Sequence, residues 1–335
     1  MIRIAINGFG RIGRNAFKAA WEKKGVAVVA INDLTEPAIL AHLLKHDSVF
    51  RTWDHKVGSN KTNLIVDGRQ IPVSAEKEPA KLPWRKYKVD VVIESTGRFT
   101  KMELAKEHLK AGAKKVVISA PAKGVPTYLI GVNDKKIKRS DKVVNNASCT
   151  TNSIAPPVAV IEKAFGIVKA MMTTVHSVTA EQNLVDGLPP PGHADLRRAR
   201  SGLINIIPTT TGAAIATTEA IPKLAGKFDG MAIRVPSIDV SLSDLTFILK
   251  KKTTVEKVNK VMRAAANSKE LKGVLGVTDE PLVSSDFVGN TYSCVVDLSM
   301  TKMVGSDMLK LLAWYDNEWG YSLRLVEMAE KVGKL

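Results

Sequence analysis

The sequence has very little cysteine: its 335 residues include only two, Cys149 and Cys294. Two cysteines exclude a disulfide framework, and no Cys-x-x-Cys pair or Cys and His cluster has the spacing of a zinc site. This usage is typical of proteins of the reducing cytosol. We therefore expect no structural metal. Because neither a disulfide nor a metal explains the cysteines, each is considered as a possible functional residue.

Long hydrophobic runs are also missing. No stretch approaches the roughly 20 apolar residues that a membrane span needs. Residues 1–10, MIRIAINGFG, run directly into a strand pattern and lack the apolar region and cleavage site of a signal peptide. With 45% hydrophobic and 24% charged residues, the chain can build two domains with separate cores. We expect a cytoplasmic protein with no membrane partner.

Acidic residues are too few to balance the basic ones: 33 Asp and Glu stand against 49 Lys and Arg, which gives a net charge of +16. This excess suggests anionic partners such as phosphorylated metabolites, a dinucleotide or RNA. The lysines are spread along the chain and lack the interleaved aromatic residues of a single-strand-binding surface. A solvated basic surface is the simpler interpretation, and nucleic-acid binding stays open as an additional property.

The first 33 residues contain a pattern for dinucleotide binding. An apolar strand at 2–7 is followed by a glycine-rich turn, a helical stretch at 14–25 and a β-branched strand at 26–33. The glycines are Gly8, Gly10 and Gly13, and Asp33 follows the last of them at the spacing expected for a ribose-binding carboxylate. A helix N-terminus suits a pyrophosphate, and the carboxylate would repel a 2′-phosphate. The pattern therefore favours NAD over NADP.

Further strands are predicted at 63–68, 89–96, 114–120 and 142–148, with a helix at 101–113. Alternating strands and helices of this kind indicate an α/β fold with a doubly wound, Rossmann-type sheet. Ligands of such sheets bind beyond the carboxyl ends of the strands, which places residues 95–97 and 119–121 at the cofactor edge. Ordinary turn chemistry explains these two segments equally well.

Cys149 lies in the segment 143–156, VVNNASCTTNSIAP, between a β-rich run and a predicted helix at 158–166. Pro156 and Pro157 fit the early turns of that helix only if residues 150–152 form an N-terminal turn before them. Cys149 is therefore expected at or beside a helix N-terminus. Free N–H groups and the helix dipole favour a thiolate there.

His176 ends a β-branched run at 167–177 and is a candidate partner for the thiol. Taken alone, a cysteine and a histidine are more often a buried apolar side chain and a surface residue. A helix-start cysteine behind a dinucleotide domain changes this assessment. A nucleophilic thiol near a nicotinamide suggests aldehyde oxidation through a covalent thiohemiacetal and a thioester.

Seven segments also carry a resemblance. They are NGFGRIGR, ASCTTN, TTVHS, DLRRAR, IIPTTTGAA, RVPSIDVSLSDL and WYDNEWGYS, and they span most of the chain in order. The sequence resembles the phosphorylating glyceraldehyde-3-phosphate dehydrogenases. The resemblance implies NAD-dependent oxidation of glyceraldehyde 3-phosphate to 1,3-bisphosphoglycerate, with inorganic phosphate as second substrate, in a cytoplasmic homotetramer.

The resemblance also implies roles for individual residues. Cys149 would be the nucleophile and His176 its acid and base partner. Thr179 and Arg234 would hold the phosphate of the substrate, and the attacking phosphate would contact Ser148, Thr150, Arg198, Thr211 and Gly212. Cofactor contacts would come from Gly8, Gly10, Arg11, Ile12, Gly13, Asp33, Lys77 and Ser119, and from Asn317 at the nicotinamide carboxamide.

The implied domains are an NAD-binding domain at 1–148 and a catalytic domain at 149–315. Because Asn317 comes so late in the chain, the C-terminal helical segment 316–335 should fold back onto the first domain. The catalytic domain is expected to be α+β with a mostly antiparallel sheet, including a long alternating strand at 232–252 and an amphipathic helix at 254–273. Cys294 is expected to be a small buried hydrophobe.

Some positions depart from the family pattern. Ser153 stands where relatives commonly have a second cysteine, and Glu181 stands where many have a shorter acid or another polar residue. A Pro-rich stretch at 187–192 should stiffen a loop that packs at a subunit interface in the family. The related erythrose-4-phosphate dehydrogenases, which pass the acyl group to water, are the nearest enzymatic alternative. The segment around Thr211 and Gly212 argues against them, because its hydroxyl and backbone amide suit a phosphate.

Overall fold

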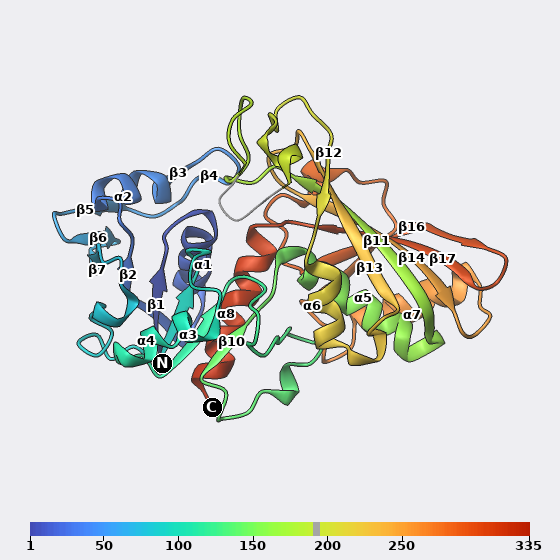
Figure 1. The fold of residues 1–335 in the computed structure, drawn as a ribbon, viewed down its shortest axis with the longest axis horizontal. Helices are drawn as coiled ribbons and strands as arrows, with labels where there is room; N and C mark the ends of the chain where they lie inside the picture. Colours follow the sequence, from blue (N-terminus) through green and yellow to red (C-terminus); the bar gives the residue numbers. More distant parts are fainter. Residues whose placement is uncertain (190–194) are drawn as a thin grey trace. The chain divides into compact units, whose positions relative to one another are not determined.

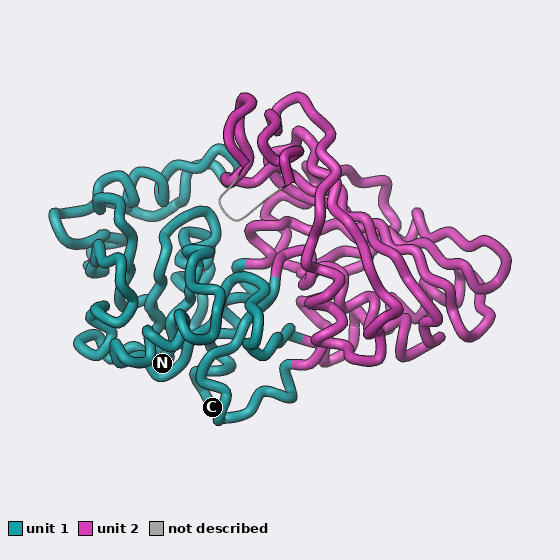
Figure 2. The backbone as a smooth tube through the Cα atoms, in the orientation of Figure 1, with its two compact units in different colours: residues 1–130, 134–147, 322–335 teal, residues 131–133, 148–321 magenta. Residues whose placement is uncertain are grey.

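The computed structural model describes residues 1–189 and 195–335. The chain forms two compact units, which differ in colour in Figure 2. Unit 1 contains residues 1–130, 134–147 and 322–335, and unit 2 contains residues 131–133 and 148–321. The last 14 residues of the chain therefore pack with its beginning, although the rest of the sequence lies between them.

Unit 1 is built on an eight-stranded sheet in the order β10-β9-β8-β1-β2-β7-β6-β5. The parallel part consists of β1 (Ile2–Asn7), β2 (Val26–Asn32), β7 (Arg69–Ser74), β8 (Val91–Glu94), β9 (Lys115–Ile118) and β10 (Val143–Asn145). The antiparallel strands β6 (Asn63–Val66) and β5 (Val57–Ser59) complete one edge. The chain passes from β1 to β2 on one side and reaches β8 on the other. This reversal of strand order is where doubly wound sheets bind ligands.

Helices cover this sheet. The N-terminal ones are α1 (Arg11–Glu22), α2 (Pro37–Lys45), α3 (Met102–Ala105) and α4 (Glu107–Lys110), and α8 (Trp319–Gly333) is the C-terminal one. The inner strands β1 and β8 are almost fully buried because they are covered on both faces. Buried residues of α8, such as Leu325 and Met328, join the same core as Ile4, Ile6 and Phe17. Burial of this apolar surface holds the C-terminal segment against the N-terminal sheet.

The helix predicted at 101–113 is shorter than expected. The structure has two four-residue helices, α3 and α4, which meet at Lys106. The two-residue strands β3 (His46–Asp47) and β4 (Arg51–Thr52) form a small separate ribbon in this unit. The 3-10 helices of the described chain are η1 (Pro79–Lys81), η2 (Asp134–Lys136), η3 (Leu196–Ala199), η4 (Pro222–Leu224) and η5 (Ser284–Phe287).

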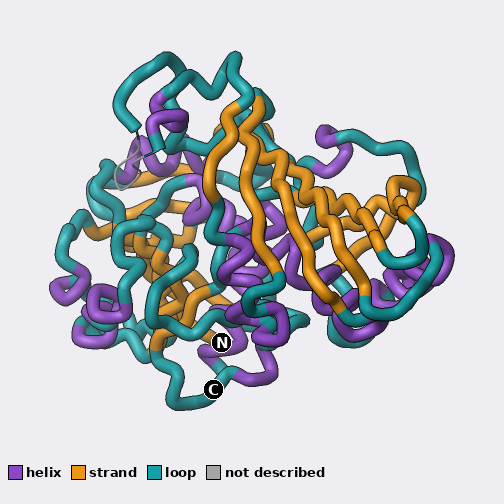
Figure 3. The backbone as a smooth tube through the Cα atoms, turned by 45° about the vertical axis from the view of Figure 1, so that its right-hand side comes forward, coloured by secondary structure: helices purple, strands orange, loops and turns teal. Residues whose placement is uncertain are grey.

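Unit 2 contains a seven-stranded sheet, whose long strands run side by side in Figure 3. Its order is β12-β13-β11-β14-β17-β16-β15. The strands are β11 (Ile167–Ser177), β12 (Ile207–Thr210), β13 (Phe228–Val235), β14 (Ser241–Leu249), β15 (Leu275–Thr278), β16 (Cys294–Val304) and β17 (Met308–Tyr315). Only β11 with β13 and β15 with β16 pair in parallel. The prediction of a Rossmann-type sheet plus a mostly antiparallel one is confirmed.

The helices α5 (Cys149–Phe165), α6 (Ala213–Ala220) and α7 (Val255–Ala266) pack against this second sheet, as Figure 1 shows. Helix α7 is shorter than the predicted 254–273 and begins after Thr254, whose hydroxyl accepts a hydrogen bond from the Lys257 backbone N–H. Cys294 is fully buried in β16, as expected. Its burial among apolar groups raises the pKa of this thiol, which makes it unsuited to be a nucleophile.

The prediction of one long strand at 232–252 is wrong. The segment forms the end of β13 and the whole of β14, which are separated by a turn at 236–240. In that turn Val240 has φ +65°, a left-handed conformation that costs a β-branched residue energy. The sequence gives no sign of this turn, because apolar residues alternate on both sides of it. Val240 is itself apolar and buried, so it fits the strand pattern.

The Pro-rich stretch at 187–192 extends beyond the described residues, so the prediction about its stiffness lies outside them. Within the described part of the chain, no helix combines the length and the apolar character needed to cross a membrane. The same residues contain no group of three or more His, Cys, Asp or Glu side chains placed to hold a metal ion.

Candidate active site

A pocket of about 350 Å³ lies in unit 1 at the carboxyl ends of β1 and β8. Four of the predicted cofactor residues line it: Gly8, Gly10, Asp33 and Lys77. The remaining lining residues are Asn7, Asn32, Leu34, Glu76, Ser95, Thr96, Arg98 and Phe99. The strand-end segment 95–97, predicted at the cofactor edge, thus contributes two residues to the wall.

Two glycines keep the backbone of this pocket closely packed. Gly8 has φ +91°, and a Cβ there would lie 2.8 Å from the backbone N of Thr96. A Cβ on Gly13 would lie only 2.1 Å from the Gly8 carbonyl oxygen. Larger residues would therefore push the loop out of shape. No side chain caps the start of α1, and a helix N-terminus in this position is suited to bind the pyrophosphate of a dinucleotide.

Asp33 is held in place by the neighbouring backbone. One carboxylate oxygen accepts a hydrogen bond from the Phe9 N–H at 2.7 Å, and the other accepts from the Thr35 N–H at 3.0 Å. A carboxylate has about four acceptor positions, so each oxygen keeps a lone pair for a further donor. This arrangement suits the two hydroxyls of a ribose, and the residues present fit NAD.

Other predicted cofactor residues do not line this pocket. The Arg11 guanidinium donates to Asp47 at 2.6 Å, so its side chain is engaged away from the glycine turn. The side chain of Ile12 packs against the core of unit 1. Ser119 follows β9, and its backbone N–H donates to the Glu94 carbonyl at 2.9 Å. The prediction for Arg11 and Ile12 concerned their backbone amides. The side-chain contacts do not test it, so it stays a prediction.

Sequence reasoning missed a buried polar network behind the pocket. Glu94 accepts hydrogen bonds from Asn7 at 2.5 Å and contacts His108 Nε2 at 2.9 Å. The Trp84 indole donates to His108 Nδ1 at 2.9 Å, which places the ring proton on Nε2, facing Glu94. The available signal was a charged residue at the end of the apolar run 91–94. This network fixes Asn7, which is part of the pocket wall.

In unit 2, Cys149 is the first residue of α5. Ser148 is the N-cap, and its hydroxyl accepts a hydrogen bond from the Thr151 N–H at 3.1 Å. The predicted position of the cysteine at a helix start is confirmed, and residues 150–152 form the expected first turn before Pro156 and Pro157. Cys149 as a residue is partly exposed, although its sulfur is surrounded by protein.

His176 lies at the end of β11 with its Nε2 atom 3.5 Å from the Cys149 sulfur. On the other side of the ring, Nδ1 is 2.7 Å from the Ser177 carbonyl oxygen. A proton on Nδ1 donated to this carbonyl leaves Nε2 as a hydrogen-bond acceptor toward the thiol. The ring is thus oriented so that a proton can pass between sulfur and Nε2.

Burial and charge set the ionisation of this pair. Burial raises the pKa of the Cys149 thiol, although the Arg234 guanidinium and hydrogen bonds from Thr150 act in the opposite direction. Burial and the charge of Arg234 lower the pKa of His176 to about 3. The backbone N–H groups at the helix start lower the thiol pKa, as predicted, and the opposing effect of burial is larger.

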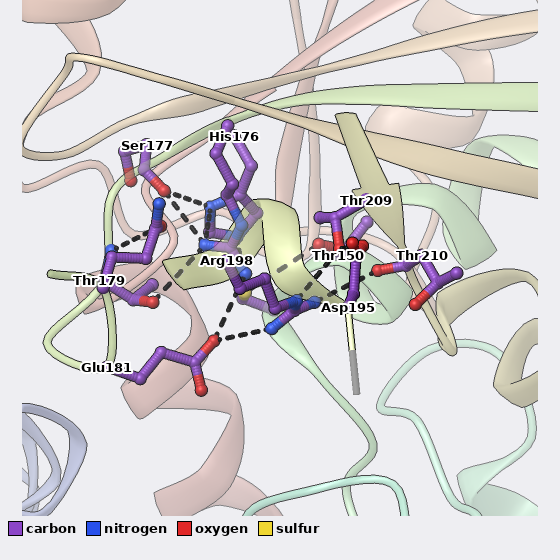
Figure 4. Close-up of polar contacts among 12 residues, drawn as sticks. Thr150, His176, Ser177, Thr179, Glu181, Asp195, Arg198, Thr209 and Thr210 are labelled. Carbon is purple, nitrogen blue, oxygen red and sulfur yellow. Dashed lines mark hydrogen bonds and ion pairs between the residues drawn. The ribbon is translucent and has the colours of Figure 1, made fainter. Parts of the chain in front are cut away.

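Two arginines surround the carboxylate of Glu181, as Figure 4 shows for Arg198. Arg198 Nη1 donates to Glu181 Oε1 at 3.0 Å, and Arg234 Nη2 lies 3.9 Å from the same oxygen. Arg234 Nη1 is also 2.9 Å from His176 Nδ1 and 3.5 Å from the Thr179 hydroxyl. Both arginine side chains are largely buried. Such a pair of guanidinium groups is suited to bind anionic oxygens.

The remaining predicted phosphate residues are less directly connected. Thr150 is buried, and its hydroxyl lies 2.9 Å from the Tyr315 hydroxyl, which sequence reasoning missed. The Thr211 hydroxyl accepts from the Ala213 N–H at 3.2 Å, and Gly212 is the N-cap of α6. Among the described contacts, none joins Thr211 or Gly212 directly to Cys149. Hydrogen bonds join Cys149 to Thr179 through His176, the Ser177 carbonyl oxygen, which accepts from His176 Nδ1 and from Arg234 Nη1, and Arg234.

Asn317 is buried in unit 2 beside two serines. Its Oδ1 accepts hydrogen bonds from the Ser177 hydroxyl at 2.9 Å and from the Ser241 hydroxyl at 2.7 Å. Ser177 directly follows His176 in β11, so a single strand end contacts both the histidine ring and the amide. Neither serine was predicted as a site residue.

Comparisons with known proteins agree with this architecture. The model of the glyceraldehyde 3-phosphate dehydrogenase NAD binding domain matches residues 2–102, and that of the C-terminal domain matches residues 148–317. The glyceraldehyde-3-phosphate dehydrogenase of Geobacillus stearothermophilus is 52% identical over 330 residues, which cover 98% of this chain and 97% of the relative.

Relatives from two other organisms are similarly close in sequence. The glyceraldehyde-3-phosphate dehydrogenase of Borreliella burgdorferi is 50% identical over 99% of this chain and all of its own length. Glyceraldehyde-3-phosphate dehydrogenase 3 of Saccharomyces cerevisiae is 48% identical over the whole of both chains. With both domain models matched in order and half of the residues shared along the whole length, the chain belongs to the glyceraldehyde-3-phosphate dehydrogenase family of NAD-dependent oxidoreductases.

Proposed function

We propose that this protein catalyses the phosphorylating oxidation of glyceraldehyde 3-phosphate to 1,3-bisphosphoglycerate with NAD, a step of glycolysis and gluconeogenesis. One observation carries the proposal: the thiol of a partly exposed cysteine at a helix start lies 3.5 Å from the Nε2 atom of an oriented histidine. The nearby guanidinium groups of Arg198 and Arg234 supply the positive charge that a substrate with a phosphate group needs.

The first step is attack of Cys149 on the aldehyde carbon. As the carbon–sulfur bond forms, His176 Nε2 takes the thiol proton, so the thiol need not ionise beforehand. The oxyanion of the adduct accepts hydrogen bonds from the imidazolium and from the Cys149 backbone N–H. Transfer of the proton from Nε2 to this oxygen completes the thiohemiacetal.

The second step converts the thiohemiacetal into a thioester on Cys149. When bound, NAD supplies the acceptor for the hydride that leaves the carbon. His176 Nε2 removes the hydroxyl proton at the same time, and the carbonyl group re-forms. The thioester preserves the energy of the oxidation for the final step.

In the last step an oxygen of inorganic phosphate attacks the acyl carbon. The carbon–sulfur bond breaks, the acyl phosphate leaves, and the sulfur recovers a proton through His176. For the phosphate of the substrate we propose Thr179 and Arg234. For the attacking phosphate we propose Ser148, Thr150, Arg198, Thr211 and Gly212, whose hydroxyl, amide and guanidinium groups suit phosphate oxygens.

We assign NAD binding to residues 1–148 with the C-terminal segment 316–335, and catalysis to residues 149–315. The pyrophosphate would be held by Gly8, Gly10, Gly13 and the backbone amides of Arg11 and Ile12. Asp33 would bind the ribose, with Lys77 near the adenine and Ser119 as a further contact. Asn317 would bind the nicotinamide carboxamide.

We further propose that the protein works as a cytoplasmic homotetramer. Unit 2 exposes an unusual amount of apolar surface on strands of its sheet, including Met171, Met231 and Met308. A surface loop adds Leu188, Ile204 and Ile206, each more than 70% exposed. Large apolar side chains exposed in this way are typical of subunit interfaces. Sedimentation at micromolar concentration tests the tetramer, and a monomer would contradict it.

The activity is tested by following NADH absorbance with glyceraldehyde 3-phosphate, with NAD and NADP in parallel. We expect NADH formation that depends on inorganic phosphate. Erythrose 4-phosphate serves as the alternative substrate, because the dehydrogenases that act on it pass the acyl group to water. Turnover that continues unchanged without phosphate would contradict the proposed function.

A further inference from the structure

We infer that Ser177 and Ser241 are positioning residues that fix the side-chain amide of Asn317 in one orientation, so that its Nδ2 donors serve the nicotinamide carboxamide oxygen. This inference rests on the proposed function, and specifically on the role of Asn317. It deepens that role, since it states which atom of the amide faces the ligand and what keeps it there.

The three side chains form a closed set of hydrogen bonds. Both serine hydroxyls donate to the same atom, Asn317 Oδ1, at 2.9 Å from Ser177 and 2.7 Å from Ser241. The Ser241 hydroxyl oxygen in turn accepts from the Ser177 backbone N–H at 3.1 Å. Ser177 is fully buried, and Ser241 and Asn317 are 2% and 4% exposed.

The opposite orientation of the amide leaves hydroxyl hydrogens without an acceptor. If Nδ2 faced the two serines, it would donate to their oxygens, and each hydroxyl proton would need another acceptor. Within the described contacts, Asn317 Oδ1 is the only acceptor for either hydroxyl. A buried donor without a partner costs roughly 1–3 kcal/mol. The amide is therefore held with Oδ1 toward the serines, which leaves its two N–H donors for a carbonyl oxygen.

The backbone and the side chain of Ser177 make two different contacts, one toward His176 and one toward Asn317. Its backbone carbonyl accepts from His176 Nδ1, whereas its side chain binds Asn317. Replacing the side chain removes only the second contact. Ser177→Ala should therefore weaken nicotinamide binding without changing the environment of the Cys149 thiol.

The experiment measures equilibrium binding of NAD and of ADP-ribose by calorimetry. ADP-ribose has the adenosine and pyrophosphate of NAD but no nicotinamide, so the ratio of the two affinities isolates the nicotinamide contact. We expect Ser177→Ala and Ser241→Ala each to reduce the NAD affinity by about 3- to 10-fold, the range of one lost hydrogen bond, while ADP-ribose binding stays within about twofold. Unchanged ADP-ribose binding also shows that the variant is folded.

Two further variants sharpen the test. Asn317→Asp keeps an acceptor for both serines but removes the N–H donors, so it should lose the nicotinamide contribution at least as fully. Ser243→Ala is the matched control, because Ser243 is a fully buried serine of the same strand β14 whose hydroxyl contacts Ser153 at 3.1 Å and not Asn317. This control should keep the wild-type affinity ratio.

The rate of Cys149 alkylation by iodoacetamide provides a readout that a general structural defect would move. We expect it to be unchanged in Ser177→Ala. Full NAD affinity in both serine variants, together with a loss in Asn317→Asp, would overturn the positioning role. Full affinity in all three variants would show that Asn317 does not contact the nicotinamide. Neither result would alter phosphate-dependent NADH formation by the unmodified protein, which tests the proposed function separately.

Discussion

The imidazole ring of His176 lies between a nucleophilic thiol and a guanidinium cation. Its Nε2 atom is 3.5 Å from the Cys149 sulfur, and its Nδ1 atom is 2.9 Å from a nitrogen of Arg234. The guanidinium charge disfavours an imidazolium and favours a thiolate. The geometry leaves the imidazole Nε2 atom facing the sulfur, where it can accept a proton when the sulfur attacks.

Replacement of Cys149 by serine tests the covalent mechanism. A serine hydroxyl is a far weaker nucleophile and does not form a thioester, so Cys149→Ser should abolish NADH formation. NAD affinity, measured by calorimetry, should stay close to that of the unmodified protein. Retained turnover would be incompatible with the covalent intermediate. Cys294→Ser does not remove the nucleophile and serves as the comparison for changes in folding.

Removal of the charge at Arg234 should shift the reactivity of Cys149. Arg234 lowers the pKa of the thiol against the larger, raising effect of burial. In Arg234→Gln the pKa should therefore rise, and the pH profile of iodoacetamide alkylation should move to higher pH. Arg263→Gln is the control, because Arg263 forms an exposed ion pair with Asp279. A profile that moves down in Arg234→Gln would contradict this electrostatic account.

Asp33 should discriminate between NAD and NADP. Its carboxylate is fixed by the Phe9 and Thr35 N–H groups, so it cannot readily turn away from a 2′-phosphate. Asp33→Gly should raise the ratio of NADP to NAD activity by about tenfold or more, since roughly 1.4 kcal/mol of repulsion corresponds to one factor of ten. Parallel kinetics with both cofactors measure the ratio. An unchanged ratio would show that Asp33 does not guard the ribose.

Glu181 should compete with anionic ligands for the two arginines. Its carboxylate contacts Arg198 at 3.0 Å and lies 3.9 Å from Arg234. Glu181→Gln removes this negative charge, so we expect the KM for inorganic phosphate to fall by about 2- to 10-fold, as for the loss of one partly exposed ion pair. Asp279→Asn, at the remote pair with Arg263, is the control. A higher KM in Glu181→Gln would mean that the carboxylate orients the arginines instead.

Asp239 should make the protein less stable as the pH rises. It is buried, and this burial together with the nearby carboxylates of Asp316 and Glu318 raises its pKa. The folded state therefore binds a proton that the unfolded chain releases above about pH 3.9, and the free energy of unfolding falls from there toward the folded pKa.

Asp239→Asn removes this dependence. We expect it to stabilise the protein by about 1–3 kcal/mol at pH 8 and to have little effect near pH 4. Urea denaturation at both values measures the difference. Asp286→Asn, on the exposed side of the same unit, provides a carboxylate without this burial. Equal effects of Asp239→Asn at the two pH values would contradict the assignment of a raised pKa.

Local sequence patterns were sufficient to predict the cofactor pocket and the position of the reactive cysteine. The glycine turn and Asp33 are neighbours along the chain or across adjacent parallel strands, so their spacing predicts the cofactor pocket. The predicted position of Cys149 at the helix start followed from Pro156 and Pro157, which lie about two helical turns later. Helix starts and strand ends depend on residues close in sequence, so they can be predicted from the sequence alone.

The tertiary structure decided what depends on distant contacts. The Thr150 hydroxyl meets Tyr315, 165 residues away, and Asn317 meets Ser177, 140 residues away. No spacing rule predicts these pairs, because packing of whole strands brings them together. The direction of the Cys149 pKa shift was likewise a matter of burial, which outweighed the local effect of the helix start. Sequence thus determined where the reactive groups lie along the chain, and the fold determined their burial, contacts and orientations.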